Sequence, residues 1–107
     1  MDRRYEREAE FFMALGHPVR LQILEFLASS PHCACELEPG FPLDQSTISR
    51  HLLTLKRAGI LRATKDGVRV IYGLTDARIL KVLRTASELM IDSTREQLLA
   101  LEARRRS

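Results

Sequence analysis

One stretch of the chain, residues 44–75, constrains the fold more than any other, because a short amphipathic helix there leads directly into a β-hairpin. Apolar residues recur at helical spacing between Asp44, a good N-cap, and Gly59, a typical C-terminal stop. The helix is predicted over residues 45–58. Its apolar stripe consists of Ile48, Leu52 and Leu55, and the opposite face is polar.

The hairpin is predicted over residues 61–74. β-branched residues typical of strands lie on both sides of Asp66-Gly67, a dipeptide that favours the type I′ turn. Residues 45–75 also carry six lysines and arginines against one acidic residue, Asp66, so their net charge is +5 in a chain whose total is +3. Such a concentrated basic patch is what binding to a polyanion such as DNA requires.

The remaining residues are predicted to form mainly helices. Helical spacing of apolar residues predicts helices over residues 5–15, 18–28 and 76–101, and a shorter one over 32–38. The sequence therefore predicts one domain, residues 1–107, that is mainly α with a small β-hairpin. The first and last helices carry more apolar surface than so small a domain can cover, which predicts a homodimer formed by these two helices.

Composition argues against several classes of protein. No apolar run approaches the roughly 20 residues that cross a bilayer, and the charged N-terminus lacks the apolar core of a signal peptide. Two cysteines one residue apart form no disulfide framework, so a reducing, cytoplasmic location is expected. No acid–base partner for a catalytic thiol is evident beyond His32, and we expect neither an enzyme nor an obligatory cofactor.

The polar face of the predicted helix has the side chains that a DNA-reading helix needs. Short polar and cationic groups near the N-terminus of such a helix reach base edges in the major groove, and here they are Gln45, Ser46, Thr47, Ser49 and Arg50. Lys56 is predicted to contact the DNA backbone, and Lys65 and Arg69 to reach phosphates or the minor groove from the hairpin. The alternative is an ordinary solvated face. The helix, the glycine stop and the basic hairpin in succession favour DNA.

Four successive segments resemble the signatures of the ArsR/SmtB repressors, namely Gly16–Leu24, Gln45–Leu52, Ala58–Leu61 and Tyr72–Asp76. The resemblance covers nearly the whole chain. It implies a homodimeric winged helix-turn-helix repressor that binds a palindromic operator in double-stranded DNA and is released by an inducer. In that family the polar face described above contacts DNA, so the helix is the recognition helix and the hairpin is the wing.

The cysteine pair, Cys33 and Cys35, is the candidate sensor. By resemblance to family members with a Cys-x-Cys motif, these thiolates would bind the inducer, a thiophilic ion such as arsenite, antimonite, cadmium, lead or zinc. Positions i and i+2 of a helix point roughly 200° apart, so both sulfurs reach one ion only if the helix starts late or unwinds there. A third ligand would come from His32, the partner subunit or an exogenous thiol.

Three other roles for the cysteines stay open at this point. The first is a repressor that responds to thiol oxidation, because a bridge between such close neighbours would be strained and easily reduced. The second is a repressor with no metal ligand, in which the cysteines are small half-buried residues. The third is a thiol-exchange or metal-carrier protein, which the lack of a Cys-x-x-Cys motif disfavours.

Overall fold

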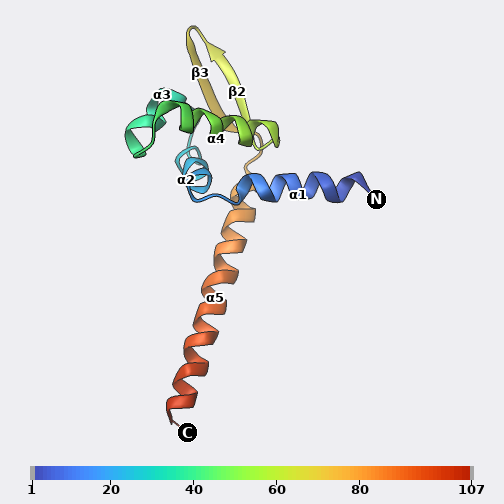
Figure 1. The fold of residues 1–107 in the computed structure, drawn as a ribbon, viewed down its shortest axis with the longest axis vertical. Coiled ribbons are helices and arrows are strands. Elements are labelled where there is room, and N and C mark those ends of the chain that lie inside the picture. Colours follow the sequence, from blue (N-terminus) through green and yellow to red (C-terminus); the bar gives the residue numbers. More distant parts are fainter. Residues whose placement is uncertain (1, 107) are drawn as a thin grey trace. The chain divides into compact units, whose positions relative to one another are not determined.

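The computed structural model describes residues 2–106, which fall into two compact units. The first unit extends to Ala77 and the second begins at Arg78. The second unit is a single helix, α5 (Arg78–Arg106). The first unit contains, in chain order, α1 (Arg3–Leu15), α2 (Pro18–Phe26), β1 (His32–Cys33), α3 (Ala34–Leu37), η1 (Glu38–Gly40), α4 (Gln45–Arg57), β2 (Leu61–Asp66) and β3 (Arg69–Leu74) (Figure 1).

The ends of α2 and α4 follow from local chemistry. Pro18 is the first residue of α2, a position where its missing N–H has no helical partner to lose. His17 caps the same helix, because its Nδ1 accepts the backbone N–H of Val19 at 3.1 Å. Asp44 caps α4 as predicted, and Gly59 follows that helix with a φ of +78°, which glycine adopts without a steric penalty.

An apolar cluster holds the first unit together. Fully buried side chains come from α2, α3, α4 and the residues that follow α4, namely Ile23, Leu24, Leu37, Ile48, Leu52, Leu55, Ile60 and Leu61. The predicted apolar stripe of α4 belongs to this cluster. Burying each such side chain contributes about 1.5–3 kcal/mol relative to leaving it exposed. This packing fixes which face of α4 remains exposed.

The sheet has three antiparallel strands in the order β1-β3-β2. β2 and β3 pair along their whole length, and Asp66 lies opposite Arg69, so the loop between them is Gly67-Val68. Gly67 has a φ of +64°, and among the described residues no non-glycine residue has a positive φ. A type I′ turn needs a positive φ at both loop residues. The predicted type I′ turn at Asp66-Gly67 is therefore wrong, because Asp66 belongs to β2.

Several predicted helix boundaries also differ from the structure. The first helix begins at Arg3 instead of residue 5, the second ends at Phe26 instead of residue 28, and the last begins at Arg78 instead of residue 76. The third helix begins at Ala34 instead of His32, because His32 and Cys33 pair with β3 as strand β1. Tertiary strand pairing here outweighs the local helical pattern. The last helix continues beyond residue 101 to Arg106, so the three terminal arginines extend the helix and are not an irregular tail.

The described architecture is mainly helical, with a small sheet whose hairpin follows the helix α4 directly. This is the predicted fold class, a winged helix-turn-helix in which α4 holds the position of the recognition helix and β2–β3 that of the wing. None of the described helices is long and apolar enough to cross a membrane.

Candidate nucleic-acid interface

The start of α4 is fixed by the carboxylate of Asp44. Its Oδ1 accepts the backbone N–H of Thr47 at 2.8 Å and the hydroxyl of Ser46 at 3.1 Å. Hydrogen bonding by Thr47, and then by Ser46, lowers the pKa of Asp44 below its ordinary value. The carboxylate is thus ionised at neutral pH, at the end of the helix where negative charge is stabilising. The first turn of α4 is held rigidly as a result.

Most of the predicted DNA readers on α4 are exposed. Gln45, Ser46, Ser49 and Arg50 lie on the surface, whereas Thr47 is half-buried. Lys56, in the last turn, is exposed as well. The exposed residues are short polar groups and an arginine near the N-terminus of the helix, which is the arrangement that base reading in a major groove requires.

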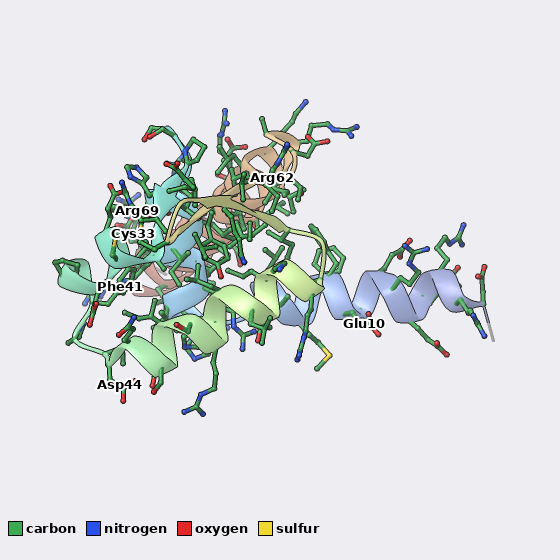
Figure 2. All side chains as sticks on the ribbon, turned by 90° about the horizontal axis from the view of Figure 1, so that it is seen from above. Glu10, Cys33, Phe41, Asp44, Arg62 and Arg69 are labelled. Carbon is green, nitrogen blue, oxygen red and sulfur yellow. A yellow bond between two sulfur atoms is a disulfide. The ribbon has the colours of Figure 1, made fainter. Side chains whose placement is uncertain are left out.

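The hairpin presents its own cations beside α4. Lys65 on β2 and Arg69 on β3 are exposed, and Val68 at the tip is fully exposed. Arg62, at the base, donates from Nη2 to the carbonyl of Thr75 at 3.2 Å. Figure 2 shows Arg62 and Arg69 at different places along the hairpin. Arg62 therefore closes the base of the hairpin, while Lys65 is exposed to solvent and Arg69 pairs with Glu36 of α3.

A polar cluster connects α4 to α1 and α2. Arg20 donates from Nε to Nδ1 of His51 at 3.1 Å and from Nη1 to the carbonyls of Met13 and Ala14 at 3.3 and 3.2 Å. The rings of His17 and His51 lie 4.4 Å apart. The structure places His51 in this cluster. The sequence gives no signal for the role of Arg20, because its partners lie on two other helices, α1 and α4.

His51 is neutral in this cluster. Burial lowers its pKa most, and electrostatic interactions with His17, Arg20 and Arg50 lower it further. Its Nδ1 accepts a hydrogen bond from Nε of Arg20, which an imidazolium, with both ring nitrogens protonated, is unable to do. The hydrogen bond that connects Arg20 of α2 to α4 therefore depends on an uncharged imidazole.

The cysteine pair lies where β1 meets α3. Cys33 is buried and is the N-cap of α3, and its Sγ accepts the backbone N–H of Cys35 at 3.1 Å. Cys35 is exposed. The two cysteines form a disulfide, with their Cα atoms 5.1 Å apart. The late start of the helix brings the sulfurs together, as the geometric argument from the sequence required.

Glu36 connects this pair to the wing. Its Oε1 accepts hydrogen bonds from the N–H of Cys33 and from Nη2 of Arg69, each at 3.1 Å, and its Oε2 lies 2.8 Å from Nδ1 of His32. The hydrogen bonds from His32 and then Cys33 lower the pKa of Glu36, so it is ionised at neutral pH. The sequence indicates the local capping box of α3 but gives no signal for the contact with Arg69, which is 33 residues away.

The surroundings of the cysteines do not form a complete metal site. Within residues 2–106, no three histidine, cysteine or acidic side chains are arranged to hold a metal ion. The two ring nitrogens of His32 contact Glu36 and the hydroxyl of Ser30, the latter at 3.2 Å. The two sulfurs are the soft donors present, and the structure assigns no third ligand.

Comparison with known sequences places this geometry among transcriptional regulators. Residues 17–63 match the family model described as bacterial regulatory protein, arsR family. An uncharacterized HTH-type transcriptional regulator of Methanocaldococcus jannaschii is 40% identical over 87 residues, which cover 80% of this chain and 98% of the relative. A probable mercury resistance operon repressor of Streptomyces lividans is 31% identical over 85 residues, which cover 79% of this chain and 68% of the relative.

Solved structures share the fold. The crystal structure of an HTH-type transcriptional regulator from Mycobacterium tuberculosis has a TM-score of 0.80 at 31% identity and covers 92% of this chain and 99% of its own. A possible ArsR-family regulator from Mycobacterium bovis, whose solution structure is that of a homodimeric winged helix-turn-helix DNA-binding domain, has a TM-score of 0.76 at 24% identity. It covers 87% of this chain and 92% of its own.

Proposed function

Because the chain belongs to the arsR family of bacterial regulatory proteins, and is thus a transcriptional repressor and not an enzyme, we propose that it binds operator DNA through α4 and the wing. One observation supports this most directly. The exposed polar first turn of α4 and the exposed cations of β2–β3 belong to one compact unit. Gln45, Ser46, Ser49 and Arg50 read base edges, and Lys56, Lys65 and Arg69 bind phosphates. The repressor acts in the cytoplasm, where the chromosomal DNA is.

The repressor works as a homodimer in this proposal. Phe12 and Met13 on α1 are 60% and 75% exposed, and α5 exposes Leu89, Met90 and Leu98 among other large apolar side chains. Apolar surface of this extent on a small chain marks an interface. A two-fold dimer presents two copies of α4 and therefore reads a palindromic operator.

A titration against DNA tests the proposal. Fluorescence anisotropy with a duplex from the promoter of the protein's own gene should give a tighter Kd than a random-sequence duplex at physiological salt. A plot of the logarithm of the binding constant against the logarithm of the salt concentration should have a negative slope of several units, since each phosphate contact releases a counterion. Equal affinity for both duplexes at physiological salt contradicts sequence-specific repression.

For the inducer we propose a thiophilic ion bound by the thiolates of Cys33 and Cys35. Thiolates are soft ligands, which suits arsenite, antimonite, cadmium, lead or zinc, and the similar Streptomyces lividans protein is named as a probable mercury resistance operon repressor. The ion binds the reduced pair, and each thiol loses its proton on ligation. Cys33 is both the N-cap of α3 and part of β1, so ligation acts on the sheet that carries the wing.

Thiol oxidation is the second candidate signal, and the disulfide between Cys33 and Cys35 is the observation that favours it. With a peroxide as oxidant, the two thiols form one disulfide bond while the O–O bond breaks, and hydrogen peroxide leaves as two water molecules. The exposed Cys35 is the sulfur that an oxidant reaches first, because Cys33 is buried. The resulting protein would lose DNA affinity without any metal.

One set of variants separates the two signals. Cys33→Ser and Cys35→Ser are each titrated on promoter DNA with arsenite, antimonite, cadmium, lead, zinc and mercuric ions, and separately with hydrogen peroxide. Metal sensing predicts that ions release the reduced wild-type protein and that both substitutions abolish this response. Oxidation sensing predicts release by peroxide alone, reversed by a dithiol. If both variants respond like wild type to every agent, the cysteines have no sensory role.

A further inference from the structure

Glu36 is the side chain at which the cysteine segment meets the wing. Its Oε1 accepts hydrogen bonds from the backbone N–H of Cys33 and from Nη2 of Arg69, each at 3.1 Å. The contact forms because Cys33 pairs with Ile71 in the sheet, which brings the start of α3 beside β3. Cys33 lies on β1 and Arg69 on β3, the strand that pairs with β1 (Figure 2). One carboxylate thus binds the residue that is the proposed sensor and a residue of the proposed DNA interface.

We propose that Glu36 is a positioning residue that competes with DNA phosphate for Arg69 and transmits the state of the Cys33–Cys35 pair to the wing. The inference rests on the proposed DNA-binding function and goes beyond it, since it assigns the connection between sensor and reader. No direct contact of Glu36 with DNA or with an inducer is involved.

The competition follows from the charges. Glu36 carries the negative charge of an ordinary carboxylate at neutral pH, and its Oε1 lies 3.1 Å from Nη2 of Arg69. The ion pair is half-exposed, with 42% of the Glu36 side chain and 50% of the Arg69 side chain accessible. Pairs this exposed are weak, so a DNA phosphate can displace the carboxylate. Breaking the ion pair costs free energy, which lowers the affinity for DNA. The displaced carboxylate also stays near the bound phosphate and repels it.

Transmission follows from the capping box of α3. In this capping box the Cys33 sulfur accepts the backbone N–H of Glu36, and the Glu36 carboxylate accepts the N–H of Cys33, so the two reciprocal bonds hold Glu36 in place. In the disulfide form the sulfur of Cys33 is fixed and Glu36 holds Arg69. In the reduced form the N-terminus of α3 has one constraint fewer, so Glu36 holds Arg69 less often and DNA binding is tighter.

The test compares Glu36→Gln with a matched control. Gln keeps the size of the side chain and can still form a capping box, but it removes the charge that attracts Arg69. Glu38→Gln removes an equal charge two residues away, from an exposed side chain with no contact to the wing among the described ion pairs and hydrogen bonds. Both variants are made in the wild-type and Arg69→Gln backgrounds, and circular dichroism and thermal unfolding verify that each is folded.

Binding is measured by anisotropy over a salt series with the promoter duplex and with a random-sequence duplex. Each protein is studied after reduction with dithiothreitol and after oxidation with hydrogen peroxide. In the oxidised form we expect Glu36→Gln to bind both duplexes about threefold to tenfold more tightly than wild type. For Glu36→Gln, the slope of the logarithm of the binding constant against the logarithm of the salt concentration should be steeper by about one, which corresponds to one more phosphate contact. In the Arg69→Gln background, Glu36→Gln should have no larger effect than Glu38→Gln.

The second readout is the ratio between the Kd of the oxidised and the reduced protein. This ratio should exceed one in wild type and in Glu38→Gln, and it should approach one in Glu36→Gln and in Arg69→Gln. The proposal needs both readouts. It is overturned if Glu36→Gln matches Glu38→Gln, if it weakens binding, or if it keeps the wild-type ratio. A wild-type protein that binds promoter and random DNA equally contradicts the proposed function. In that case the affinities of the variants for the random duplex still test the role of Glu36.

Discussion

Arg20 donates from Nε to Nδ1 of His51 at 3.1 Å, although 31 residues separate the two in the sequence. The same guanidinium binds the carbonyls of Met13 and Ala14, the last turns of α1. The side chain of Arg20 on α2 therefore forms hydrogen bonds with both α1 and α4, the helix that carries the proposed DNA-reading residues.

We expect Arg20→Ala to destabilise the protein by about 1–3 kcal/mol, because it removes hydrogen bonds from a charged donor and leaves the part-buried acceptors unpaired. Urea unfolding measures this change. Arg7→Ala is the control, since Arg7 is exposed on α1 and carries the same charge. An Arg20→Ala variant no less stable than Arg7→Ala would show that the cluster does not hold the helices together.

Stability should fall as the pH drops through the histidine range, because the pKa of His51 is lowered in the folded protein. The unfolded chain takes up this proton near pH 6.5, and the folded chain does so only at lower pH. Between these two values the unfolded state binds more protons, so the free energy of unfolding decreases with acidification and levels off below the folded pKa. Urea unfolding from pH 7.5 downward measures this dependence.

His51→Gln keeps an acceptor for Arg20 and removes the titrating group. The variant should lose this part of the pH dependence and keep the part at lower pH, where Glu36 and Asp44, whose pKa values are lowered, become protonated. An unchanged slope between wild type and His51→Gln would assign the acid sensitivity to another group.

Asp44→Ala should lower the Tm by a few degrees, because it leaves the N–H of Thr47 without its acceptor at the start of α4. Asp44→Asn should be much closer to wild type at neutral pH, since asparagine caps helices nearly as well. The lowered pKa of Asp44 means that its stabilising effect is present at neutral pH and is lost as the pH falls through the folded value. Thermal unfolding followed by circular dichroism at neutral and acidic pH measures these differences.

Two substitutions on α4 should separate base reading from phosphate binding. Arg50→Ala should weaken binding to promoter DNA by roughly tenfold or more and relax sequence preference, as expected for a side chain that reads base edges. Lys56→Ala should weaken promoter and random DNA alike and reduce the salt slope by about one. Anisotropy titrations on both duplexes provide the comparison. If Arg50→Ala weakens both duplexes equally, Arg50 is a phosphate contact.

Much of the fold follows from patterns that are local in the sequence. The stripe of Ile48, Leu52 and Leu55, the cap at Asp44 and the stop at Gly59 together determine α4, and all of them lie where predicted. The hairpin was predicted in place but with its turn displaced by one residue. Asp66 pairs with Arg69 and therefore belongs to β2. Turn propensity considers only the local sequence and does not predict this pairing.

The long-range contacts that connect the proposed interface to the rest of the first unit follow from the tertiary structure alone. His32 and Cys33 have a helical pattern locally, yet they pair with β3, and this pairing sets the late start of α3 that brings the two sulfurs together. The contacts from Arg20 to His51 and from Glu36 to Arg69 span more than thirty residues each. Helix periods and caps report interactions within a few residues, so the sequence by itself identified the reading helix, the wing and the cysteine pair. Long-range polar contacts depend on how separate elements pack, and only the folded chain shows how these parts are connected.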